Sequence, residues 1–124
     1  MNDSYLYTKD HEWINVDNDL AIIGITEFAQ SELGDIIFVE FPQTGDKFKK
    51  GEVFGTIEAV KTVADLFMPV SGTIIEINTK IEDMPELINA NALTDGWIVK
   101  IKLSDKDELL KLLSKEEYNN IING

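Results

Sequence analysis

The chain has 124 residues, of which 44% are hydrophobic and 27% charged, and this suits one compact domain with a modest core. Its 23 acidic and 11 basic residues give a formal net charge of −12, and every basic residue is a lysine. An acidic surface without guanidinium groups repels polyanions, so nucleic acid and anionic membranes are excluded as partners. The lack of cysteine excludes disulfides, thiolate metal sites and cysteine nucleophiles.

Residues 1–103 read as short strands separated by turn residues. Alternation of polar and apolar residues, and short apolar runs, predict strands at 12–16, 20–25, 35–41, 53–58, 63–67, 72–77 and 97–103. A short helix is expected over residues 27–33, with Thr26 as its N-cap and Gly34 as its stop.

The carboxyl-terminal end changes character. Leucines follow Ser104 at helical spacing, and Tyr118, Ile121 and Ile122 follow Ser114 in the same way. The segment from Ser114 to Glu117 has the pattern of a capping box, in which the two side chains satisfy each other's backbone amides. Two short helices packed on a sheet are therefore predicted.

These elements predict a mainly β fold, a sandwich or flattened barrel with a short internal helix and C-terminal helices. No linker and no repeat interrupts the chain, so residues 1–124 are expected to form a single domain. Its β core would span about residues 5–103 and its helical segment about 104–123. No apolar run is long enough to span a bilayer, and the polar start is not a signal or transit peptide. A cytoplasmic prokaryotic protein is expected.

Ordinary catalytic machinery is hard to assemble from these residues. His11 is the only histidine, which excludes a histidine metal cluster, and no serine stands in a nucleophile elbow. The glycines are spaced as turn residues and form no phosphate-binding loop. His11 itself is interpreted as a strand-end residue with a structural hydrogen bond.

Lys61 lies between two strand-like runs and is therefore predicted at the tip of a hairpin. A lysine in that position projects into solvent with a protonated amine. The position alone indicates no more than a solvated surface lysine.

An ordered series of motifs runs through residues 9–102. Its segments are Lys9-Asp10-His11-Glu12-Trp13, Ile23-Gly24-Ile25-Thr26-Glu27-Phe28-Ala29-Gln30, Leu33-Gly34-Asp35-Ile36-Ile37-Phe38-Val39-Glu40, Glu58-Ala59-Val60-Lys61, Met68-Pro69-Val70-Ser71-Gly72, Glu76-Ile77-Asn78 and Gly96-Trp97. In order and spacing this series resembles the H proteins of the glycine cleavage system. The four residues ending at Lys61 would be a weak match alone, whereas the ordered series is specific.

The resemblance implies a lipoyl-domain-like β-sandwich (a barrel-sandwich hybrid) and a lipoate attached covalently to Lys61. It also implies a non-catalytic carrier that takes an aminomethyl group from the pyridoxal-phosphate glycine decarboxylase to the tetrahydrofolate-dependent aminomethyltransferase. A flavin dihydrolipoamide dehydrogenase would then reoxidise the dithiol. A lipoate ligase, or a lipoyl or octanoyl transferase, would attach the arm.

Residue by residue, the same resemblance points to three acidic side chains. Glu12 and Asp65 are expected to hold the cationic aminomethyl arm in a surface groove, and Glu58 to help the ligase recognise the hairpin. The chain departs from the family between Ala90 and Asp95, where a Pro-Tyr-Gly type of segment is usual. Asp10 is a second variable position, which adds negative charge before His11.

Four other classes of protein compete with this interpretation. A biotin carrier usually has methionines beside its lysine, and a 2-oxoacid dehydrogenase lipoyl domain usually has aspartate before it, whereas Val60 and Thr62 flank Lys61 here. An unmodified interaction module would leave Lys61 free. An H-like lipoate relay or regulatory scaffold, which passes lipoyl groups to other complexes, needs the same hairpin as the shuttle and stays open.

Overall fold

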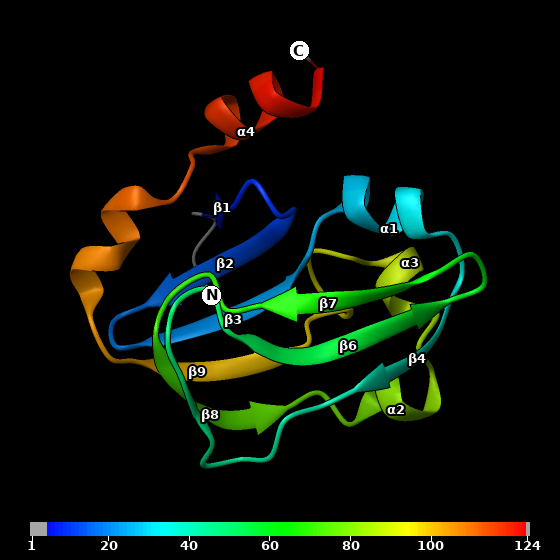
Figure 1. Ribbon diagram of the computed structural model, residues 1–124, viewed down its shortest axis with the longest axis horizontal. Helices are drawn as coiled ribbons and strands as arrows, with labels where there is room; N and C mark the ends of the chain where they lie inside the picture. The colour runs from blue at the N-terminus through cyan, green and yellow to red at the C-terminus, as the bar shows by residue number, and fades with distance from the viewer. Residues whose placement is uncertain (1–4, 124) are drawn as a thin grey trace.

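Two antiparallel sheets form the centre of the computed structural model, which describes residues 5–123 (Figure 1). The six-stranded sheet has the order β1-β2-β3-β9-β8-β5, made of β1 (Tyr5–Tyr7), β2 (Glu12–Asp17), β3 (Leu20–Ile25), β9 (Val99–Leu103), β8 (Gly72–Ile77) and β5 (Lys47–Phe48). The three-stranded sheet has the order β4-β6-β7, made of β4 (Ile36–Glu40), β6 (Val53–Ala59) and β7 (Val63–Phe67). The expected mainly β sandwich is confirmed.

Short helical segments cover the ends of the sandwich. They are α1 (Glu27–Leu33), α2 (Lys80–Asp83), α3 (Leu87–Ala90), the 3₁₀ helix η1 (Lys106–Lys111) and α4 (Lys115–Asn123). In Figure 1, α1 lies beside the free end of the β6–β7 hairpin, and α4 lies apart from it beyond β1. No helix in the described part of the chain is long and apolar enough to cross a bilayer.

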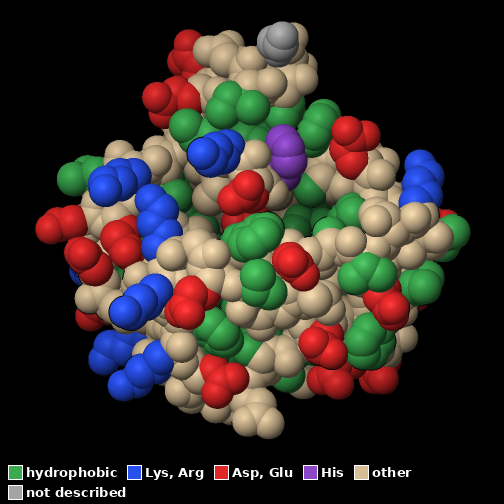
Figure 2. All heavy atoms as spheres, in the orientation of Figure 1, with side chains coloured by type: hydrophobic (Ala, Val, Ile, Leu, Met, Phe, Trp, Pro, Cys, Tyr) green, Lys and Arg blue, Asp and Glu red, His purple; other side chains and the backbone are tan. Residues whose placement is uncertain are grey.

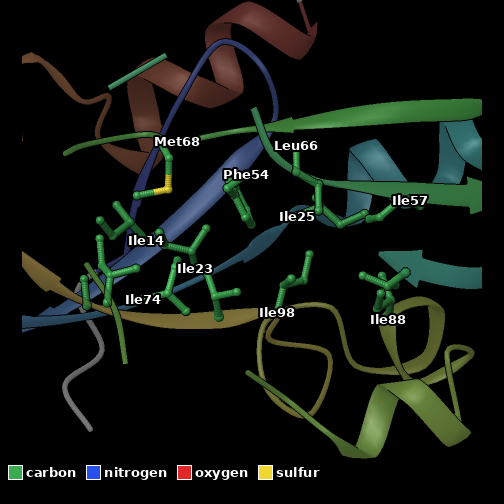
Figure 3. Close-up of a cluster of buried hydrophobic side chains, with 14 of the residues drawn as sticks. Ile14, Ile23, Ile25, Phe54, Ile57, Leu66, Met68, Ile74, Ile88 and Ile98 are labelled. Carbon is green, nitrogen blue, oxygen red and sulfur yellow. The ribbon is translucent and has the colours of Figure 1, made fainter. Parts of the chain in front are cut away.

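The core lies between the two sheets and is rich in isoleucine. Figure 3 labels ten of its side chains: Ile14, Ile23, Ile25, Phe54, Ile57, Leu66, Met68, Ile74, Ile88 and Ile98. Removing each such side chain from water contributes about 1.5–3 kcal/mol, and β-branched side chains suit a pleated surface. The core therefore holds the β6–β7 hairpin against the larger sheet, with Ile57 and Leu66 on its inner face.

A second, aromatic cluster attaches the C-terminal helix to the sandwich. Tyr7, Trp13 and Tyr118 are buried together, and Tyr7 also exchanges two backbone hydrogen bonds with Leu113, at 2.7 and 2.8 Å. Gly24 lies opposite Trp13, where a Cβ atom would come within 2.6 Å of the indole ring. Glycine is therefore required at this position for the buried indole to lie flat on β3.

Several boundaries differ from those expected from the sequence. The strands β1 and β5 and the helices α2 and α3 were not predicted, and the first C-terminal helix is 3₁₀ in form. β9 begins at Val99 and not at Trp97, because the Trp97 amide donates to the Thr94 carbonyl in a turn. The predicted helix over residues 27–33 is confirmed, with Thr26 as its N-cap and Gly34 as its C-cap.

Candidate functional site

Lys61 lies at the tip of the β6–β7 hairpin, as predicted. The turn is closed by the Ala59 amide, which donates to the Thr62 carbonyl at 2.8 Å, and the Val60 amide donates to the Asp35 carbonyl at 3.0 Å. The second bond ties the hairpin tip to the segment between α1 and β4. Lys61 is exposed and forms no ion pair among the described residues, so acylation of its amine would break no electrostatic contact.

Gly34 provides the surface beneath the lysine stem. Its φ of +83° is the left-handed conformation that favours glycine at the end of a helix. A Cβ atom added there would lie 3.5 Å from Cε and 3.6 Å from Cδ of Lys61. The stem of Lys61 therefore begins its course across the C-terminal end of α1, beside Leu33.

A groove of about 290 Å³ runs between α1 and β7. Its lining residues come from residues 10–12 and the end of β3 (Asp10, His11, Glu12 and Ile25), from α1 (Phe28, Ala29, Glu32 and Leu33) and from the β6–β7 hairpin (Ile57, Ala64, Asp65 and Leu66). One lining residue, Leu33, directly precedes Gly34, over which the Lys61 stem lies. Its floor is apolar, and four of its lining residues are acidic while none is a lysine.

Glu12 and Asp65, the two predicted arm contacts, both line this groove but differ in environment. Asp65 is exposed, whereas Glu12 is only 3% exposed. The Glu12 carboxylate accepts hydrogen bonds from the Phe67 amide at 2.8 Å and from the Thr8 hydroxyl at 3.3 Å. Burial outweighs these bonds and raises the pKa of Glu12 to about 8.

Glu58 lies outside the groove. It is an exposed residue of β6, opposite Val63 of β7 on one side and Phe38 of β4 on the other. Its carboxylate is therefore displayed on the outer face of the hairpin, close to Lys61 in sequence but not beside the groove.

Sequence reasoning missed several parts of the site. It identified Asp10 only as an added charge, although Asp10 lines the groove, and it gave no role to Phe28. It also gave Gly34 no role beyond stopping α1, although Gly34 lies under the lysine stem. The contact to Gly34 depends on the Val60–Asp35 hydrogen bond, which brings segments together that no local pattern connects.

A second hollow of about 360 Å³ adjoins the groove and shares Asp10 and Glu12 with it. Three lysines, Lys9, Lys50 and Lys111, line it. Figure 2 shows the lysine side chains of this face gathered mainly on its left side, toward η1 and away from the hairpin tip. The two adjoining hollows therefore differ in charge, and a cation would favour the acidic groove.

The loop from Ala90 to Asp95, where the sequence departs from the family pattern, is held by side chains of the sheet. The Trp13 indole donates to the Ala92 carbonyl and the Tyr5 hydroxyl to the Leu93 carbonyl, both at 2.8 Å. The loop is therefore fixed by residues of β1 and β2, which are distant in sequence from the β6–β7 hairpin.

The fold and the site together define a carrier domain: a small β-sandwich that displays one free lysine on a hairpin beside a groove. A family model for the glycine cleavage H-protein matches residues 5–124. Glycine cleavage system H proteins of two strains of Staphylococcus epidermidis are each 48% identical over 118 residues, covering 95% of this chain and 94% of theirs. The crystal structure of a glycine cleavage system H protein from Mycobacterium marinum matches with a TM-score of 0.89 and 32% identity, over 100% of both chains.

The chain belongs to the glycine cleavage H-protein family. Proteins of this family carry a lipoyl-lysine and are non-catalytic carriers of the glycine cleavage system. Their function is to shuttle aminomethyl groups and reducing equivalents on the lipoyl arm.

Proposed function

We propose that Lys61 is the lipoyl-bearing lysine of this carrier and that the groove between α1 and β7 receives the loaded end of the arm. The observation that carries the proposal is the position of Lys61, whose free amine stands at a hairpin tip while its stem lies over Gly34. An arm attached there starts over Gly34, the neighbour in sequence of the groove residue Leu33.

When bound, the lipoyl group supplies a reducible disulfide and a thiol that carries the aminomethyl unit. The chain contributes the attachment point and the surface along which the arm folds back. Amide formation removes the positive charge of Lys61, which leaves an apolar stem suited to the apolar floor of the groove. A short flexible tether also gives the arm an effective concentration in the range of mM at each site that it can reach.

The acidic side chains account for retention of a loaded arm. The loaded arm ends in a cationic amine, and the groove offers carboxyl groups from Asp10, Glu12, Glu32 and Asp65 without a competing lysine. A cation beside Glu12 favours its ionised form, which opposes the effect of burial on its pKa. An amine docked in the groove would therefore form an ion pair with ionised Glu12, and the groove would hold the arm away from water.

Three enzymes and one attachment system are proposed as partners. These are glycine decarboxylase with pyridoxal phosphate, aminomethyltransferase with tetrahydrofolate, dihydrolipoamide dehydrogenase, and a lipoate ligase or a lipoyl or octanoyl transferase. The exposed Glu58 on the outer face of the hairpin is proposed to help the attachment enzyme recognise Lys61. The cytoplasmic location expected from the sequence stays a prediction.

The groove proposal is tested with the double variant Glu12→Gln and Asp65→Asn in the lipoylated, aminomethyl-loaded protein. Both substitutions preserve side-chain size while removing charge, so loss of the aminomethyl group to water should become several-fold faster. The exposed Glu76→Gln, on β8 and outside the groove, is the matched control. A lifetime equal to that of the unsubstituted protein would contradict the proposed role of the groove in retaining the loaded arm.

A glycine decarboxylation–exchange assay distinguishes the shuttle from a lipoate relay. The lipoylated protein should support exchange between bicarbonate and the carboxyl group of glycine when glycine decarboxylase is added. A fully lipoylated protein that is inert in this assay would favour the relay.

A further inference from the structure

The hydroxyl of Tyr118 joins three parts of the molecule that are distant in sequence. Tyr118 is the buried residue of α4, 4% exposed, and its ring stacks on Tyr7 with 4.8 Å between centroids. Its hydroxyl oxygen lies 2.7 Å from Oγ1 of Thr26 and 2.9 Å from Nδ1 of His11. One phenol of the C-terminal helix therefore contacts both the residue that caps α1 and the residue before β2.

Both of these contacts reach the groove. Thr26 Oγ1 accepts from the Ala29 amide at 3.2 Å as the N-cap of α1, and the Thr26 amide donates to the His11 carbonyl at 3.0 Å. His11 and Ala29 line the groove directly, and the His11 ring packs on Phe28 with centroids 4.7 Å apart. The Tyr118 hydroxyl is therefore one hydrogen bond away from His11 and two away from Ala29, which belong to adjoining walls of the groove.

The two ends of α1 are held differently. The helix has seven residues and none of them is fully buried, and at its C-terminal end the Asn89 side chain donates to the Gln30 side chain and the Gly34 carbonyl. The first turn is held instead through the N-cap Thr26 and its contact to Tyr118. His11 has a φ of +68°, a left-handed conformation that costs free energy in a residue other than glycine. The bonds from Tyr118 therefore stabilise both the first turn of α1 and the His11 backbone. Both bonds lie at part-buried or buried positions, where a hydrogen bond is stronger than in water.

The directions of these hydrogen bonds follow from the donors available. In one arrangement the Thr26 hydroxyl donates to Tyr118 and the Tyr118 hydroxyl donates to Nδ1 of His11, while Thr26 still accepts from the Ala29 amide. In the reverse arrangement Nδ1–H of His11 donates to Tyr118, which donates to Thr26, and the Thr26 hydroxyl proton then has no acceptor among these groups. The first arrangement is therefore favoured.

We propose that Tyr118 is a positioning residue for the arm groove: its hydroxyl fixes His11 and the first turn of α1 and so sets the wall against which the arm rests. The proposal rests on the proposed function of the groove. It gives the C-terminal helix a role in protecting the carrier's cargo, although α4 itself does not line the groove.

The test is Tyr118→Phe in the full-length protein, a substitution that keeps the ring stacked on Tyr7 and removes only the hydroxyl. The control is Tyr5→Phe, which removes a phenol hydroxyl away from the groove, with its one hydrogen bond to the Leu93 carbonyl, whereas Tyr118→Phe removes two. In the unmodified protein, NMR measures the ring nitrogen shifts of His11 and the amide exchange of residues 28–30. In the loaded protein, the rate of loss of the aminomethyl group is measured.

Tyr118→Phe should shift the His11 ring resonances, accelerate exchange in α1 by about fivefold, as loss of one hydrogen bond implies, and shorten the lifetime of the loaded arm. Tyr5→Phe should do none of these. A second variant, His11→Asn, retains a residue that tolerates positive φ while removing the ring, and it should loosen α1 similarly. The His11 shift separates this role from a general loss of stability, and near-UV circular dichroism checks that each variant is folded.

Unchanged His11 resonances and unchanged exchange in α1 would overturn the proposal. An unchanged lifetime in Tyr118→Phe, with a shortened lifetime in the double variant at Glu12 and Asp65, would overturn it while leaving the groove intact. Unchanged lifetimes in both would remove the proposed function of the groove and this inference with it.

Discussion

Glu12 shows how one buried carboxyl group connects the stability of this carrier to its site. Its side chain is 3% exposed, and its hydrogen bonds to the Phe67 amide and the Thr8 hydroxyl hold it between the sandwich and the groove. Burial of a group that prefers to be charged in water is costly unless that group becomes neutral or meets a cation. In the unmodified protein the raised pKa favours the neutral carboxyl group. A loaded arm in the groove would supply a cation.

The pKa of Glu12 predicts a specific pH dependence of stability. Because burial raises the pKa from 4.5 to about 8, the folded protein binds this proton more tightly than the unfolded chain. The contribution of Glu12 is therefore full below the unfolded pKa and is lost as pH rises through the folded pKa, by at most about 1.4 kcal/mol per pH unit. This loss of stability is measured by urea unfolding of the parent protein and of Glu12→Gln at pH values between these two pKa values.

The difference in unfolding free energy between the parent protein and Glu12→Gln should fall steadily across that window and level off above it. Ser31→Ala, which changes no ionisable group, should show no such slope and is the control. A difference that is constant with pH would mean that Glu12 is ionised throughout.

At the scale of the element, the sequence was most informative where local chemistry decides the structure. The capping box at Ser114 is present as predicted, since the Ser114 amide donates to Glu117 at 2.9 Å and the Glu117 amide donates to Ser114 Oγ at 3.2 Å. The hairpin around Lys61 and the helix capped by Thr26 were predicted for the same reason. Turn and cap residues bond to near neighbours, so their pattern is visible in a few residues.

Elements that depend on distant partners could not be predicted in this way. The strand β1 is only three residues long and exists because it pairs with β2 and Leu113. The helices α2 and α3 each have four residues, too few to show a periodic pattern, and each buries one isoleucine in the core. The Tyr118 contact to His11 spans 107 positions, and no local signal indicates it. The organisation of residues 1–124 as one domain stays a prediction.

The capping box gives the prediction at this scale. Ser114→Ala should destabilise the protein by about 1 kcal/mol, the usual cost of losing an N-cap side chain, and should loosen α4 first. Ser31→Ala, in the exposed body of α1, is the control, because its hydroxyl bonds only to the Phe28 carbonyl of its own helix. Urea unfolding and amide exchange in α4 measure the effect. Equal stability of the two variants would contradict a structural role for the cap.

At the scale of the whole molecule, charge is distributed unevenly. The net charge is −12, yet the hollow lined by Lys9, Lys50 and Lys111 adjoins a groove whose charged residues are all acidic. A carrier that binds several enzymes in turn benefits from fast, electrostatically steered association and from ready dissociation. The overall charge favours partners whose docking surfaces are basic.

Encounter with the enzymes should therefore depend on salt. Raising the ionic strength from about 0.05 M to about 0.2 M shortens the screening length, so the KM for the lipoylated carrier in the exchange reaction should rise while kcat changes little. The lifetime of the isolated, loaded carrier, measured at the same two salt concentrations, separates encounter from retention of the arm. A KM that does not change with salt would contradict electrostatic steering.

Attachment of the arm to Lys61 is tested by mass spectrometry after expression with lipoate and its ligase. The intact protein should gain the mass of one lipoyl group, and peptide mapping should place that group on the hairpin peptide that contains Lys61. Lys61→Arg, which keeps the charge but offers no acylatable amine, should remain unmodified in the same cells. A lipoyl group found on any of the ten other lysines, or a modified Lys61→Arg protein, would contradict attachment of the arm to Lys61.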